Sequence, residues 1–145
     1  MARLILASAL VAISAACSAA YPSCGSHPFF SMRKDDGTTI GLVASEEDVA
    51  KGPAWTPGHS EPPLSPGKAI QLATAWAQSN WKRFDSFRVH TITLQGFGCD
   101  TQHEKWLYVV DMAPVVDGNA MFGGAYFVGV LMDGSILPAK PVKDF

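Results

Sequence analysis

The sequence predicts an α+β fold in which one main helix packs on an antiparallel β-meander of three to four strands, preceded by a Pro-rich irregular arm. One amphipathic segment lies at about 66–81, and segments with alternating apolar residues follow it closely. Short connections favour antiparallel neighbours, because a parallel crossover needs a dozen or more residues. With 145 residues, 48% of them apolar and 17% charged, the chain has the composition of one globular domain.

The start of the helix is marked by Ser65 and Pro66, since Ser is a favoured N-cap and Pro a favoured first helical residue. From there to about Trp81, apolar residues recur at helical spacing. They are Ala69, Ile70, Ala73, Trp76 and Ala77. The small alanine side chains allow close approach to a flat partner, and we expect the sheet to be that partner.

The first strand of the meander is predicted at FRVHTITLQGF, residues 87–97. Its apolar residues change face between Val89 and Ile92. A change of face within one strand requires an extra residue, so the sequence predicts a β-bulge near His90 and Thr91.

The next two strands alternate plainly between apolar faces. One face of KWLYVVDMAPV holds Trp106, Tyr108, Val110 and Met112. The corresponding face of GAYFVGVLM holds Tyr126, Val128, Val130 and Met132. Asp133-Gly134 then predicts a tight hairpin into a short last strand at residues 135–137.

The arm before the helix, residues 21–64, is rich in Pro, Gly and Ser. Proline fixes φ and removes a backbone donor, so the run at 54–67 should be extended and irregular. Asp36-Gly37 between apolar flanks indicates one hairpin within the arm. The predicted organisation is a signal segment at 1–20, the arm at 21–64 and the helix-and-sheet domain at 65–145.

Residues 1–20 have the pattern of a secretory signal peptide: Arg3, an apolar run, and a tail of small residues. The apolar run is too short for a comfortable membrane span, which needs about 20 residues. We therefore expect an exported protein, either periplasmic or secreted.

Two processing sites compete. Small residues at Ser18 and Ala20 suit ordinary cleavage, which would release a soluble chain beginning at Tyr21. Alternatively, the segment from Ser14 to Cys17 is similar to a bacterial lipoprotein box, in which Cys17 would be lipidated and would anchor the protein to a membrane. The small-residue cleavage site favours soluble export, and the lipoprotein remains the alternative.

The charge balance argues against nucleic acid as a partner. Loss of residues 1–20 removes Arg3 and no acid, which leaves ten basic and thirteen acidic residues. The densest basic cluster, Lys82, Arg83 and Arg88, is too small for the many phosphate contacts on which nucleic-acid affinity depends.

Two Cys-His pairs are the sharpest candidates for chemistry. Cys24 precedes His27, and Cys99 precedes His103, so together they would offer a Cys2His2 set to zinc. Each half mixes ligand types, however, which is unlike a zinc finger. Whether Cys17 is cleaved off or lipidated, only Cys24 and Cys99 remain as a pair.

We therefore predict a structural disulfide between Cys24 and Cys99, because an exported protein meets an oxidising compartment. Closing the loop from residue 24 to residue 99 stabilises the fold by an amount on the order of 4 kcal/mol in the loop-entropy model. No cofactor is expected, and zinc remains the alternative.

A catalytic Cys99 would need a base and an orienting carboxylate. The candidates are His59, His90 and His103 as bases and Asp100 and Asp111 as carboxylates. Cys99 has no family-specific flank, and the chain lacks G-x-S-x-G, H-E-x-x-H and phosphate-binding glycine motifs. No catalytic residue is assigned, although a small Cys/His hydrolase or zinc-binding protein remains the second hypothesis.

The glycine-rich run DGNAMFGG, residues 117–124, places Met121 and Phe122 in a loop. They either contact a partner protein or fold back over the sheet edge, and the residues leave both open. An open edge strand of a short meander also offers strand pairing with a partner or a second copy, so the oligomeric state stays open.

The helix followed by a meander resembles the PepSY-type domains of secreted bacterial proteins. The similarity covers residues 65–138 and rests on the W-x-Y-x-V strand from Trp106 to Val110 and on the V-x-V-L-M-D-G-x-I hairpin around Asp133 and Gly134. The insert at 117–124 and the Pro-rich arm depart from that pattern. The resemblance implies a non-catalytic protein-binding or inhibitory role toward peptidases or other envelope proteins, with an unknown partner.

Overall fold

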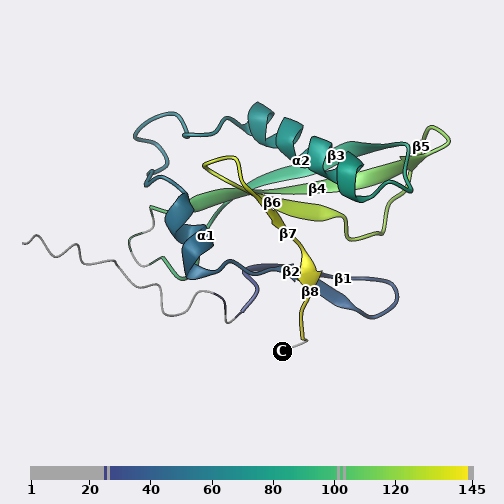
Figure 1. Cartoon of the computed structure of the whole chain (residues 1–145), viewed down its shortest axis with the longest axis horizontal. Coiled ribbons are helices and arrows are strands. Elements are labelled where there is room, and N and C mark those ends of the chain that lie inside the picture. The colour runs from purple at the N-terminus through teal and green to yellow at the C-terminus, as the bar shows by residue number, and fades with distance from the viewer. Residues whose placement is uncertain (1–24, 26, 101, 103, 144–145) are drawn as a thin grey trace, which may run out of the picture.

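The computed structural model describes residues 25, 27–100, 102 and 104–143 (Figure 1). In chain order, their elements are β1 (Phe30–Arg33), β2 (Thr39–Leu42), α1 (Glu46–Lys51), α2 (Pro66–Asn80), β3 (Ser86–Gly96), β4 (Trp106–Val116), β5 (Asn119–Ala120), β6 (Phe127–Leu131), β7 (Ile136–Pro138) and β8 (Lys140–Pro141).

The α+β architecture with one main helix on an antiparallel sheet is confirmed. The main sheet has the order β3-β4-β6-β7, and the short β5 pairs with the end of β4. All its pairings are antiparallel. Figure 1 shows α2 on one side of this sheet and the small sheet β1-β2-β8 on the other. The molecule therefore has three layers.

The main helix forms where the sequence predicts it. The Ser65 hydroxyl accepts a hydrogen bond from the Lys68 backbone N–H (3.2 Å), which satisfies one of the donors left free at a helix start. Ala69, Ala73 and Ala77 are fully buried against the sheet. Small side chains on that face let the helix lie close to β3, β4 and β6.

The predicted bulge in β3 is also confirmed. The register between β3 and β4 shifts between Val89 and Thr91, so His90 has no partner across the strand pair. Beyond the bulge, Thr91 pairs with Asp111 of β4. The bulge exposes His90 at a sheet edge, since β3 is the outermost strand.

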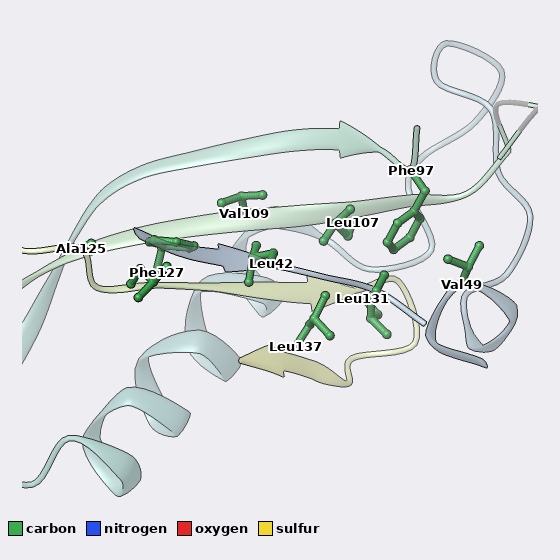
Figure 2. Close-up of a cluster of buried hydrophobic side chains, with 11 residues drawn as sticks. Leu42, Val49, Phe97, Leu107, Val109, Ala125, Phe127, Leu131 and Leu137 are labelled. Carbon is green, nitrogen blue, oxygen red and sulfur yellow. The ribbon is translucent and has the colours of Figure 1, made fainter. Parts of the chain in front are cut away.

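Both faces of β4 are buried, which the sequence prediction of a single covering helix did not include. Tyr108, Val110 and Met112 pack toward α2, as expected. Leu107 and Val109 point to the opposite face and join a second apolar cluster (Figure 2).

This second cluster is covered by part of the segment predicted as an irregular arm, and that prediction needs correction. The β1–β2 hairpin, expected around Asp36-Gly37, supplies the fully buried Leu42, and α1 supplies the fully buried Val49 (Figure 2). In the described part of the arm, the long irregular stretch is the one from Gly52 to Ser65, between α1 and α2.

The C-terminal hairpin follows the prediction with one addition. Gly134 has φ +90°, and its N–H donates to the Leu131 carbonyl (2.9 Å), which closes the turn predicted at Asp133-Gly134. After β7, the short β8 pairs with β2. The end of the chain therefore joins the two sheets, a connection that the sequence did not predict.

Candidate functional site

The loop of residues 121–126, called the contact loop below, joins β5 to β6. A tight turn precedes it, with positive φ at Asp117 (+49°) and Gly118 (+78°). The Met121 N–H donates to the Pro114 carbonyl (2.8 Å), and the Met112 N–H donates to the Tyr126 carbonyl (2.8 Å). Both ends of the contact loop are thus attached to β4.

The contact loop exposes two large apolar side chains. Met121 is 52% exposed and Phe122 is 70% exposed. Phe122 makes an edge-to-face contact with the His90 ring, with the centroids 6.0 Å apart. Phe122 thus lies beside the edge strand β3 at His90 and still exposes most of its ring, so both alternatives that the sequence leaves open stay open.

A cavity of about 220 Å³ lies next to the contact loop and is called the histidine cavity. The bulge in β3 presents His90 to it, the neighbouring strand contributes Asp111, and β1 contributes Arg33. Burial raises the pKa of the Asp111 carboxyl, while the nearby His90 acts in the opposite direction. The sequence did not identify Arg33 as a site residue. No pattern in the sequence around Arg33 indicates that this part of the arm lies next to the middle of the main sheet.

The histidine cavity does not contain the candidate nucleophile Cys99. Cys99 lines a separate cavity of about 230 Å³ with His27, Phe29 and Phe97. Along β3, Thr91 and Gly96 are five residues apart, about 17 Å at 3.3 Å per residue, and Cys99 lies beyond Gly96. The structure therefore does not assemble Cys99, His90 and Asp111 into one catalytic group.

Asp100, the other candidate carboxylate, has a structural role. Its side chain is only 2% exposed. Its carboxylate accepts hydrogen bonds from the backbone N–H groups of Gln102 (3.1 Å), Glu104 (2.7 Å) and Lys105 (2.6 Å). These bonds organise the connection between β3 and β4, so the carboxylate is engaged by the backbone.

The predicted disulfide and the zinc alternative both include residues outside the described ones, Cys24 and His103. Gly25, which follows Cys24 in the chain, lines the same cavity as His27 and Cys99. The chain beside Cys24 thus approaches Cys99. Within the described residues, no group of three or more His, Cys, Asp and Glu side chains is arranged to hold a metal ion.

Comparison of the chain with protein-family models, curated proteins and solved structures finds no match. In the described part of the chain, no helix is long and apolar enough to cross a lipid bilayer.

Proposed function

We propose that the protein is a non-catalytic exported module that binds another secreted or envelope protein through Met121 and Phe122, either as an inhibitor or as an interaction partner. The observation that carries the proposal is an apolar pair, more than half exposed, on a loop attached to β4 at both ends. Phe and Met are enriched at protein interfaces, and a fixed loop loses little conformational entropy on binding.

The sequence supports the same function in two ways. The pattern of residues 1–20 is typical of an export signal, with soluble export favoured over lipidation at Cys17. The resemblance of residues 65–138 to PepSY-type domains implies a protein-binding or inhibitory role in the cell envelope. Met121 and Phe122 belong to the insert at 117–124 that departs from that family pattern, so they would give this protein a binding surface that the family pattern does not include.

The test uses a photo-crosslinking amino acid at position 122 of the mature chain, with the same amino acid at the exposed Gln78 on α2 as the matched control. Each variant is incubated with the secreted and envelope fraction. We expect a discrete crosslinked protein from position 122 only. Excess wild-type chain should compete for it, whereas the double variant Met121→Ser, Phe122→Ser should not. Equal crosslinking from both positions, or equal competition by the double variant, would contradict the proposal.

A zinc-binding protein or small Cys/His hydrolase is the alternative that the sequence leaves open, although no group of three or more His, Cys, Asp and Glu among the described residues is arranged to hold a metal ion. Zinc content of the exported protein separates the two functions. The zinc-binding alternative would be favoured if the wild-type protein carried one equivalent of zinc and the Cys99→Ser and His27→Ala variants each carried none.

A further inference from the structure

A larger cavity, of about 420 Å³, lies where the end of α2 and the start of β6 face the small sheet. We call it the basic cavity, because Lys34, Lys82 and Arg83 line it and, among residues 25, 27–100, 102 and 104–143, no carboxylate does. Trp81 and Tyr126 also line it. This volume is within the range of small-molecule sites, about 300–1,000 Å³.

Arg83 is held in place at the basic cavity by uncharged groups. Its Nη2 donates a 2.7 Å hydrogen bond to the Tyr126 hydroxyl, and its guanidinium carbon lies 4.7 Å from the centre of the Phe84 ring. The Tyr126 ring packs edge-to-face against both Trp81 and Phe84, with centroids 5.3 and 5.2 Å apart. These contacts orient the guanidinium through groups that carry no charge, and the bond to Tyr126 uses one of its five N–H donors.

Within the part of the chain that the structure describes, Lys34, Lys82 and Arg83 form no ion pair. Among the residues that the structure describes, the ion pairs join Lys51 of α1 with Glu47 and Asp48. Two acids of the β1–β2 turn, Asp35 and Asp36, line an adjoining cavity together with Lys34 and Arg83. Asp36 accepts a 2.8 Å hydrogen bond from the Thr38 N–H, which keeps its carboxylate within its own turn.

We propose that the basic cavity binds a small organic anion, a carboxylate attached to a planar apolar body. Arginine binds carboxylates with two parallel hydrogen bonds, and Lys34 and Lys82 add charge at the same cavity. The planar body would pack against Trp81 and Tyr126, which supply an aromatic wall. This site is separate from Met121 and Phe122, so it does not depend on the proposed protein-binding function.

The experiment titrates the folded mature chain with 2-naphthoate and follows the backbone amide signals by NMR. Neutral 2-naphthamide has the same body without the charge, and acetate has the charge without the body. We expect saturable shifts at residues 80–83 and 125–126 with a Kd of about 1 mM or tighter. Both control compounds should bind at least about tenfold more weakly, and high salt should weaken 2-naphthoate. Equal binding of the naphthamide, or no saturable shift up to roughly 10 mM, would overturn the proposal.

Variants locate the charge that the ligand contacts. Arg83→Gln and Lys82→Gln should each weaken 2-naphthoate binding about three- to tenfold, because each removes one charged contact. Lys51→Gln is the matched control and should leave the Kd unchanged, since Lys51 lies on α1 and pairs with its own acids. All three side chains are at the surface, and a dispersed spectrum verifies folding. Equal losses in all three variants, or no loss in Arg83→Gln and Lys82→Gln, would contradict the assignment.

Discussion

Arg83 donates a hydrogen bond of 2.7 Å to the hydroxyl of Tyr126, a residue 43 positions further along the chain. The bond connects the corner between α2 and β3 to the start of β6. Tyr126 has little freedom there, because Gly124 lies directly against its ring. A Cβ at position 124 would overlap ring atoms of Tyr126.

Gly124→Ala should therefore displace Tyr126 and lower the free energy of unfolding by about 1–3 kcal/mol, the usual effect of overpacking. Urea unfolding measures this change. Gly67→Ala is the matched control, because nothing lies within 4 Å of a Cβ at that position in the first turn of α2. It should leave stability unchanged or raise it by up to about 1 kcal/mol. A Gly124→Ala protein as stable as Gly67→Ala would show that Tyr126 moves aside freely.

Asp100→Ala should lower the free energy of unfolding by about 3 kcal/mol. The substitution leaves three backbone N–H groups of the β3–β4 connection without their carboxylate acceptor, and each buried donor left unsatisfied costs about 1–3 kcal/mol unless water replaces the acceptor. Asp100→Asn keeps one acceptor oxygen and should lose less. Chemical denaturation measures both variants, and equal losses would mean that the side-chain volume rather than the hydrogen bonds stabilises the loop.

The elements α2, β3, β4 and β6 were predictable because each is long enough to show a period, and β7 was predictable from the turn at Asp133-Gly134. The alanines of α2 recur at helical spacing, and the change of face in β3 identifies the bulge at His90 from the sequence alone. The opposite face of the main sheet was not predictable. β1 and β2 have four residues each and α1 has six, which is too short for a periodic pattern.

The sites were less predictable than the fold, since they depend on residues far apart in the chain. Lys82 and Arg83 look like a solvated helix end until Lys34 and Tyr126 are placed beside them. Likewise, His90 and Cys99 are close in sequence but line different cavities, because β3 is extended between them. One local signal for α1 did exist: Ser45 and Asp48 form a capping box, which marks the start of a helix too short to show a period.

The stability of the protein should depend on pH through Asp111. Burial raises the pKa of this carboxyl in the folded protein above its value in the unfolded chain. A carboxyl whose pKa is higher in the folded protein than in the unfolded chain contributes stability at pH values below its pKa in the unfolded chain. That contribution is lost as the pH rises through its pKa in the folded protein. The Asp111→Asn side chain carries no charge that must be buried. This variant should therefore be more stable than the wild type at pH 7 and no more stable than the wild type at pH 3.

Thermal unfolding of both proteins across this pH range measures the difference. The other residues with ionisable side chains that line the histidine cavity are His90 and Arg33. His90→Ala removes a group that lowers the pKa of Asp111, so the loss of stability should move to higher pH in that variant. A difference between Asp111→Asn and the wild type that stays constant from pH 3 to pH 7 would contradict the role of burial.

If Cys24 and Cys99 are paired as predicted, neither should react with a thiol reagent before reduction and both should react after it. Cys24→Ser and Cys99→Ser should lower the free energy of unfolding by similar amounts, on the order of 4 kcal/mol, and the double variant should lose no more than either. Thiols that react without reductant, together with zinc released by a chelator, would instead support the Cys2His2 alternative.

Phe122→Ala and Phe127→Ala form a matched pair that separates binding from folding. Phe122 is 70% exposed on the contact loop, whereas Phe127, five residues later on β6, is fully buried in the cluster of Figure 2. Phe127→Ala should therefore lower the free energy of unfolding by about 3–5 kcal/mol, and Phe122→Ala should change it by less than about 0.5 kcal/mol. Urea unfolding gives both values. If Phe122→Ala destabilises the fold by several kcal/mol, its ring is part of the core, and the contact loop is not a free binding surface.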